Sequence, residues 1–167
     1  MKNLLKQFSI AFAILALGCL ILTAWGRWII RPQSFADIFP AAIEEIDRCE
    51  VQIEYVGLDR VSGELTSEQL EELLDRLDQT RYKGRLSNIT DRFSNSITGI
   101  PTAISPTARL YLEKRGQLRV ELMLCGDTFV VNPLQGSNDP GGSYDTEGGS
   151  QFQEELIAWL EDTINKS

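Results

Sequence analysis

The side chains that could do chemistry in this chain are carboxylates, arginines and three cysteines, because the sequence contains no histidine. The absence of histidine removes the commonest general base near neutral pH and the commonest metal ligand. Paired carboxylates such as Glu50 and Glu54 could serve glycoside hydrolysis, which depends on the separation of two carboxyl groups in space. The sequence contains no serine-nucleophile, phosphate-loop or dinucleotide-binding motif. We therefore assign no catalytic residue and no cofactor, and we expect the chain not to be an enzyme.

Arginine and tyrosine side chains gather on the outward face of a predicted hairpin. Arg109 and Tyr111 alternate with leucines in one strand, and Arg119 alternates with apolar residues in the next. Exposed aromatic and arginine residues together are typical of binding patches. We therefore predict Arg109, Tyr111 and Arg119 as a binding surface. The alternative is ordinary cross-strand pairing, such as Arg109 with Glu121. A further basic run could extend the same face: Arg81, Lys83 and Arg85.

Three acidic residues, Asp139, Asp145 and Glu147, lie in a glycine-rich segment at 135–149. Hard oxygen ligands on a flexible backbone suit calcium, although the spacing differs from that of an EF-hand loop. The alternative is a hydrophilic surface loop without a metal. No metal site is assigned beyond this calcium possibility.

Two cysteines lie in predicted strands with opposite orientation. Cys49 shares its parity with the buried row that contains Val51, whereas Cys125 shares its parity with the outward row that contains Arg119. A disulfide requires Cα atoms within about 7 Å and side chains directed at each other. We therefore expect Cys49 to be a small core residue rather than half of a disulfide.

The N-terminal segment 1–31 is predicted to be a membrane anchor. Its 20 residues from Gln7 to Gly26 are uncharged, with Lys2 and Lys6 before them and Arg27 and Arg31 after them. A helix of this length reaches about 30 Å, the hydrocarbon thickness of a bilayer. Two tryptophans at its C-terminal end suit the membrane interface, Trp25 and Trp28.

Two other interpretations of this segment stay open, a cleaved signal peptide and a lipoprotein signal. A cleaved signal peptide would have a short apolar core that ends at a small-x-small site, whereas here the apolar run continues to Trp25. Lipidation at Cys19 would follow a lipobox in which Ala16 and Leu17 stand in the reverse of the usual order. With an uncleaved anchor and a short leading tail, the following domain is expected to be extracytoplasmic, in a single-pass membrane protein.

The rest of the chain is expected to form a juxtamembrane connector at 32–48 and one α+β domain at 49–167. All 24 acidic residues lie after Arg31 with 12 of the 16 basic residues, so this part of the chain carries a net charge of −12. A strongly acidic domain does not suit nucleic acid, which requires a basic surface.

Two amphipathic helices are predicted in the domain. Thr66 and Gln69 form a capping-box pattern before a leucine stripe that continues to Leu77. Ser150 and Gln153 repeat the capping-box pattern before a closing helix. Its apolar stripe contains Phe152, Leu156, Trp159, Leu160 and Ile164.

Alternating residues from Val51 onward and from Ala108 to Val131 predict strands of one antiparallel sheet. To keep the apolar rows of the first hairpin on one face, we predict a three-residue loop at 114–116, which sets Leu112 opposite Leu118. A two-residue loop at Gly126 and Asp127 sets Leu124 opposite Phe129 in the next hairpin. The predicted fold class is thus α+β, an N-terminal transmembrane helix followed by one antiparallel sheet covered on one face by two helices.

An anchor, a strand, a Thr-capped leucine helix that ends near Tyr82-Lys83-Gly84-Arg85, and an antiparallel meander together resemble small membrane-anchored extracytoplasmic domains of unknown function from Gram-positive bacteria. The resemblance implies an envelope location and no activity. We predict a membrane-tethered, non-catalytic interaction domain that contacts the membrane through its N-terminal helix and binds an envelope protein or wall polymer. The alternatives are a small-ligand-binding or sensor domain and, third, a carboxylate-dependent hydrolase.

Overall fold

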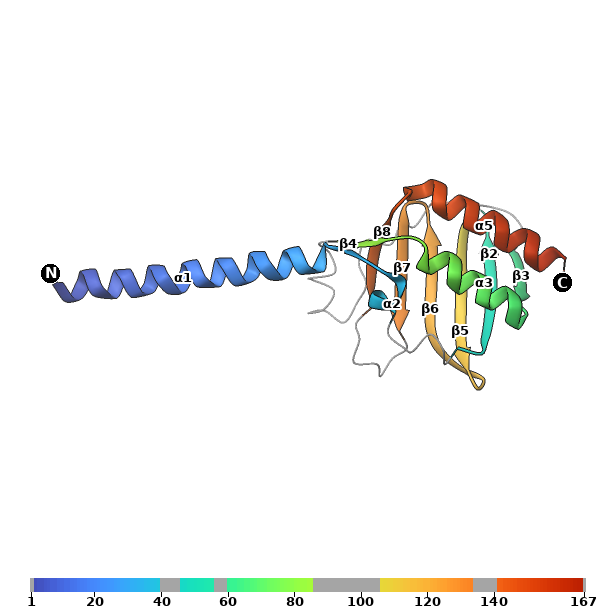
Figure 1. The fold of residues 1–167 in the computed structure, drawn as a ribbon, viewed down its shortest axis with the longest axis horizontal. Coiled ribbons are helices and arrows are strands. Elements are labelled where there is room, and N and C mark those ends of the chain that lie inside the picture. Colours follow the sequence, from blue (N-terminus) through green and yellow to red (C-terminus); the bar gives the residue numbers. More distant parts are fainter. Residues whose placement is uncertain (1, 40–45, 56–59, 86–105, 134–140, 167) are drawn as a thin grey trace.

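The computed structural model describes residues 2–39, 46–55, 60–85, 106–133 and 141–166, and in this part of the chain it shows an α+β fold (Figure 1). The elements follow one another as α1 (Lys2–Ile29), β1 (Pro32–Gln33), α2 (Phe35–Ile38), β2 (Arg48–Glu54), β3 (Arg60–Glu64), α3 (Ser67–Asp78), β4 (Tyr82–Gly84), β5 (Thr107–Lys114), β6 (Gln117–Cys125), β7 (Thr128–Pro133), β8 (Gly142–Thr146) and α5 (Gly149–Asn165).

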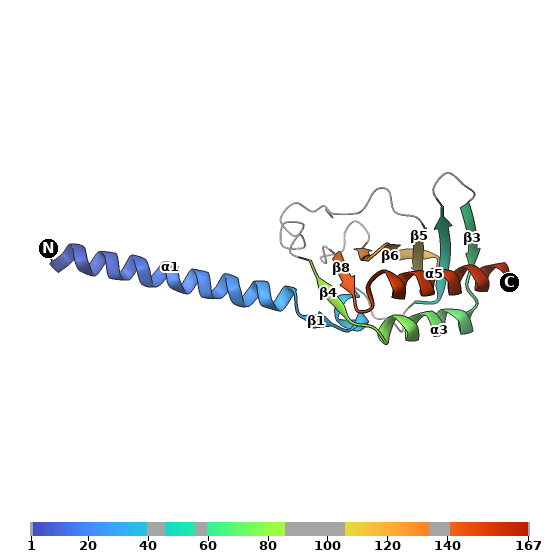
Figure 2. The ribbon, with the colours of Figure 1, turned by 90° about the horizontal axis from the view of Figure 1, so that it is seen from above.

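The strands form one antiparallel sheet of eight described strands in the order β1-β4-β8-β7-β6-β5-β2-β3. The predicted α+β class with a single antiparallel sheet is confirmed. Helices α3 and α5 lie on the same face of the sheet (Figures 1 and 2). The core lies between these helices and the sheet, where the inward residues of β2, β5, β6 and β7 are buried. Edge strands β1 and β3 were not predicted.

Helix α3 begins with the predicted capping box of Thr66 and Gln69. The Thr66 hydroxyl accepts a hydrogen bond from the Gln69 N–H at 3.3 Å, and the Gln69 side chain accepts one from the Thr66 N–H at 2.8 Å. These two bonds satisfy backbone donors that a helix start leaves free. Leu70, Leu73 and Leu77 are buried against the sheet, so the predicted helix is confirmed.

The β5–β6 hairpin differs from the predicted register. Arg115 and Gly116, with φ of 51° and 72°, form a two-residue turn, so the predicted three-residue loop is wrong. Leu112 lies opposite Val120 rather than Leu118 because a β-bulge leaves Arg119 without a partner residue in β5. The bulge shifts the register by one residue and returns the leucines of both strands to one face.

The β6–β7 register matches the prediction. Leu124 lies opposite Phe129 and Leu122 opposite Val131. Gly126, at the start of this turn, has a φ of 65°, which glycine adopts without strain. The burial of Val51, at 0% exposure, confirms the alternation predicted for β2.

The predicted glycine-rich loop at 135–149 is wrong over 142–146, which form strand β8 between β7 and β4. Gly142 lies opposite Val131, and Ser143 and Tyr144 are buried. Local glycine content favours a loop, but pairing with strands on both sides supplies hydrogen bonds that a loop would lack. Residues 134–140 of the predicted loop lie outside the described residues.

The N-terminus of α5 is set by backbone conformation and not by the predicted Ser150 capping box. Gly148 is the N-cap residue with a φ of 88°, and no side chain caps the helix. The left-handed conformation turns the chain from β8 into the helix, and glycine adopts it without strain. The Gln153 side chain instead is buried and donates to the Thr146 hydroxyl at 3.5 Å. The predicted apolar stripe does pack on the core.

The segment just after α1, which the sequence places in the connector, contributes to the core through Phe35. Its ring lies 5.9 Å from that of Tyr82 and 6.3 Å from that of Phe129, and the Tyr82 and Phe129 rings are 4.9 Å apart. The Tyr82 hydroxyl donates to the Leu77 carbonyl at 2.8 Å. Aromatic pairs at these separations stabilise packing beyond the area that they bury.

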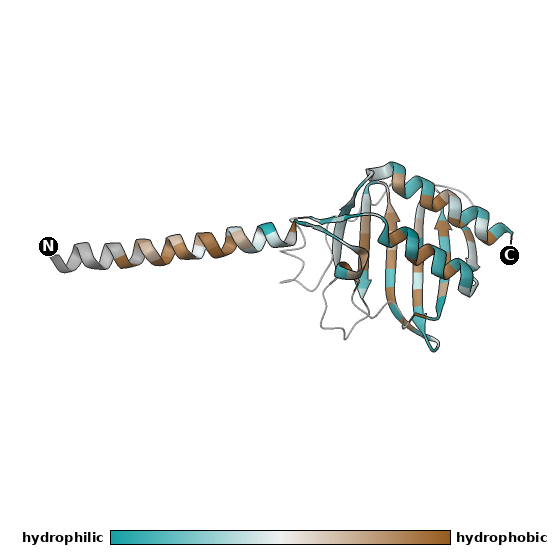
Figure 3. Cartoon of the chain, in the orientation of Figure 1, coloured by the Kyte–Doolittle hydropathy of each residue, from teal (hydrophilic) through white to brown (hydrophobic). Residues whose placement is uncertain are grey.

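Helix α1 projects from the side of the domain that carries β1 and β4 (Figure 1). Most of its described apolar side chains are exposed, and Figure 3 shows the apolar colouring along the helix. Among the residues that the structure describes, none of the helices is both long enough and apolar enough to cross a membrane. The predicted membrane span is therefore not confirmed and stays a prediction.

The turn at Arg115 and Gly116 yields a stability prediction. Arg115→Asn should raise the free energy of unfolding by about 0.5–1 kcal/mol, because asparagine tolerates a positive φ better than arginine. Gly116→Ala should lower it by about 1–2 kcal/mol, because a Cβ is strained in the left-handed region. Urea unfolding in detergent, monitored by circular dichroism, measures the free energy of unfolding of both variants. Lys114→Asn is the control and should bring no gain; if it stabilises as much as Arg115→Asn, the turn assignment is wrong.

Candidate functional site

The predicted binding residues lie on the face of the sheet opposite α3 and α5 (Figure 2). Residues that alternate with the core leucines and valines point to this face. Toward β7 and β8 the face is buried, with Val130 and Ser143 each 1% exposed. Over β2, β5 and β6 its residues are half-buried. We name this region the β2–β5–β6 patch, which consists of Glu50, Gln52, Arg109, Tyr111 and Glu121.

Arg109 lies at the centre of the patch and is held by two glutamates. Its Nη1 donates to Glu121 Oε1 at 3.2 Å, and its Nε lies 3.9 Å from Glu54 Oε2. Burial opposes the positive charge, but Glu121 and Glu54 outweigh it and hold the Arg109 pKa above its ordinary value. The guanidinium thus stays charged and is paired with carboxylates in the described structure.

Two buried polar atoms of the patch lack hydrogen-bond partners. They are the acceptor Gln52 Oε1 and the donor Arg109 Nε. The two residues lie directly opposite each other in β2 and β5. The Gln52 amide nitrogen is engaged, because it donates to Glu50 Oε1 at 2.9 Å. An unsatisfied buried polar group costs about 1–3 kcal/mol, so this pair is a point at which a partner would gain hydrogen bonds.

The patch is not the basic surface that the sequence suggests. Arg48, at the start of β2, pairs with Glu64 at 2.7 Å and with Glu113 at 3.0 Å. The pairing of Arg109 with Glu121 matches the predicted cross-strand alternative. Arg48 and Arg109 are therefore both paired with neighbouring carboxylates.

The other predicted residues separate into two groups. Tyr111 lies beside Arg109, since its phenol contributes to raising the Arg109 pKa. Arg119 lies in the bulge, exposed, and donates to Gln117 Oε1 at 3.1 Å. The basic run at 81–85 lies toward the opposite edge of the sheet, four strand spacings from β5, or about 19 Å. The expected extension of the patch over that run is therefore wrong.

The candidate calcium ligands do not form a site in the described structure. Asp145 belongs to β8 and accepts a hydrogen bond from Arg85 Nε at 2.6 Å, and Asp139 lies outside the described residues. Glu147 is exposed after β8. In the described part of the chain, no group of three or more His, Cys, Asp or Glu residues could hold a metal ion.

The two domain cysteines are buried on opposite faces of the sheet and do not form a disulfide. Cys49 is 0% exposed among the core residues, and burial together with Glu50, Glu113 and Glu64 raises its pKa to about 12. Cys125 is 1% exposed, with its Sγ 3.7 Å from the Thr107 hydroxyl. Neither thiol has the exposure that a nucleophile requires. Cys19, the candidate lipidation residue, is exposed on α1.

Sequence reasoning identified Arg109 and Tyr111 but missed Gln52 and Glu54. The alternation in β2 could place both on the outward face, yet nothing local indicates that β2 pairs with β5. Only that pairing brings Gln52 opposite Arg109.

Comparison of the chain with protein-family models, with curated proteins and with solved structures finds no match in any of the three. The functional conclusion therefore rests on the geometry and charge of the molecule itself.

Removal of the unpaired acceptor should not destabilise the fold. Gln52→Met should leave the free energy of unfolding unchanged or raise it by up to about 1 kcal/mol, because it removes a buried polar atom that has no partner. Arg109→Met is the contrasting variant and should lower it by about 1–2 kcal/mol, because Glu121 and Glu54 then lose their cation. Urea unfolding measures both; a large loss in Gln52→Met would show that its side chain is fully bonded.

Thiol labelling should report the burial of both domain cysteines. In a Cys19→Ser variant, a water-soluble maleimide should label neither Cys49 nor Cys125 in the folded chain, and both after unfolding in urea. Raising the pH to about 9 should leave Cys49 unlabelled, because its raised pKa keeps the thiol protonated. Mass spectrometry counts the labels. Rapid labelling of Cys49 in the folded chain would contradict its place in the core.

Proposed function

We propose that the chain is a membrane-tethered, non-catalytic interaction domain. Helix α1 anchors it, and the β2–β5–β6 patch binds an envelope protein or a wall polymer. The domain would lie on the extracytoplasmic side, because a long domain that follows an apolar segment is translocated largely regardless of its charge.

The exposed apolar surface of α1 supports the anchor. Nine of its described large apolar side chains are 48–73% exposed, and at 100° per residue those from Ile10 to Leu22 point in all directions around the helix. A helix that is apolar on every side requires a non-aqueous environment or a buried position. Trp28 at its C-terminal end is stacked by Arg31, whose guanidinium lies 5.3 Å from the ring centroid. Such pairs suit the membrane interface.

The unpaired atoms Gln52 Oε1 and Arg109 Nε carry the binding proposal. Both side chains are only half-buried, so a change of rotamer brings each free atom to the surface. A ligand amide could then donate to Gln52 and accept from Arg109, and Tyr111 beside them supplies an aromatic contact. Amides occur in protein backbones and in the peptide and acetamido groups of wall polymers, which are the partners proposed.

Tethering makes a weak patch sufficient. A domain held at a membrane meets partners in that membrane or in the adjoining wall at a high effective concentration. The glutamates around Arg109 add selectivity, since they disfavour acidic ligands.

Site-specific photo-crosslinking in cells that produce the full chain tests the proposal. A photoreactive phenylalanine at position 111 should form crosslinked products in membranes that were washed with alkaline carbonate before analysis. The same group in place of Glu72, on the exposed side of α3, is the matched control and should not. Release of the chain by the carbonate wash would overturn the anchor. Equal crosslinking from both positions would overturn the patch.

A further inference from the structure

A groove of about 430 Å³ lies at the sheet edge that adjoins α1, and we name it the anchor-side groove. It is lined by Pro32, by residues 81–83 and by residues 145–147. Lys83 is its central residue, because it lies opposite Pro32 in β1 and opposite Asp145 in β8. Tyr82, whose side chain is fully buried in the core, is also among the lining residues.

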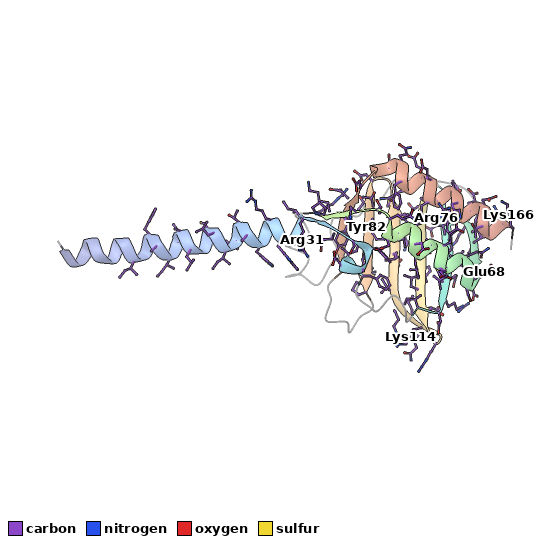
Figure 4. All side chains as sticks on the ribbon, viewed as in Figure 1. Arg31, Glu68, Arg76, Tyr82, Lys114 and Lys166 are labelled. Atoms are coloured by element: carbon purple, nitrogen blue, oxygen red, sulfur yellow. The ribbon has the colours of Figure 1, made fainter. Side chains whose placement is uncertain are left out.

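The groove lies where the chain leaves the anchor. Pro32 follows the last residue of α1 by three positions. Figure 4 shows Arg31 and Tyr82 at the end of the domain next to α1, and Lys166 at the opposite end. Hydrogen bonds with Ser34 lower the pKa of Asp37, and the charges of both Arg31 and Arg81 lower it further, which places these two arginines in one neighbourhood.

Free cations and engaged carboxylates distinguish this edge from the rest of the acidic domain. Within the described structure, Arg81 and Lys83 are exposed and form no ion pair within 4.0 Å. By contrast, Asp145 is bound to Arg85, and Asp37 accepts a hydrogen bond from the Ser34 N–H at 3.0 Å. Glu147 is the remaining acid of the groove lining.

We propose that the anchor-side groove binds the headgroup of an anionic phospholipid in the membrane that holds α1. This inference rests on the proposed membrane anchor. Arg81 and Lys83 bind the phosphate, and Asp145 and Glu147 accept hydrogen bonds from hydroxyl groups beyond it. A phosphatidylglycerol headgroup supplies both chemistries, since it carries one phosphodiester and two hydroxyls. Basic side chains near an anionic leaflet each strengthen the contact about fivefold.

Binding of the headgroup would set the orientation of the domain. The β1–β4 edge would face the membrane and the β3 edge would point away from it. The β2–β5–β6 patch would then lie in the half of the sheet that is farther from the membrane, out of contact with the lipid.

Hydrogen exchange of the full chain in lipid nanodiscs tests the inference. Discs of phosphatidylcholine alone are compared with discs that contain about one third phosphatidylglycerol, a fraction that gives a negative surface potential. Amides of β1 and β4 should exchange at least about fivefold more slowly in the anionic discs. The difference should vanish in about 1 M salt, where the Debye length is about 3 Å.

A pair of matched variants separates the groove from general charge. The Arg81→Gln, Lys83→Gln chain should lose the lipid-dependent protection, because both phosphate-binding cations are gone. The Arg60→Gln, Lys166→Gln chain has the same charge change at the far edge and should keep it. Unchanged exchange in β5 to β7 verifies that each variant is folded.

The outcomes distinguish the two proposals. A chain that fails to co-elute with any disc overturns the anchor, and this inference with it. A chain that co-elutes but shows equal exchange in both discs overturns the lipid site alone. Loss of protection in both variants also overturns the lipid site, because it indicates an effect of general charge. Equal protection by millimolar inorganic phosphate in phosphatidylcholine discs overturns it as well, because it indicates a soluble ligand.

Discussion

The burial of Tyr82 is the constraint on which the half of this fold next to α1 depends. Its ring packs between Phe35 and Phe129, and its hydroxyl is bonded to the carbonyl of Leu77. Burial raises the pKa of the phenol, so it stays a neutral donor. One side chain thereby joins the segment after α1, the end of α3, and strands β4 and β7. With Tyr82 in the core, the alternating residue Lys83 must face outward, which creates the basic wall of the anchor-side groove.

Two surfaces with different charge patterns lie at different positions along the sheet. Free cations lie at the edge next to α1, whereas matched arginine–glutamate pairs lie over β2, β5 and β6. A net charge of −12 after the anchor segment disfavours general contact with an anionic membrane, so contact through the basic edge alone would be directional. The tether and the groove would hold the domain in one orientation, and the patch would act from that position on partners at high effective concentration.

The hairpin of β5 and β6 shows why a correct constraint can lead to a wrong register. The two apolar rows do share the core face, as their alternation requires. A three-residue loop and a two-residue turn with a bulge both meet that requirement, and the sequence does not distinguish them. The Arg115 N–H donates to the Asp47 carboxylate at 2.9 Å, a contact with residues far away in the chain that favours the observed turn. Local turn rules contain no such information.

The sequence by itself determined the elements that local patterns encode: the capped leucine helix, the alternating strands, the Gly126 turn and the outward position of Arg109 and Tyr111. Side-chain periodicity and capping act over a few residues, so they can be read without a fold. Strand neighbours are different, because pairing joins residues distant in sequence. Only the tertiary structure placed β8 between β7 and β4, brought Gln52 opposite Arg109, and carried Lys83 to the edge beside the anchor. Both candidate sites arise from those long-range pairings, which local propensity does not encode.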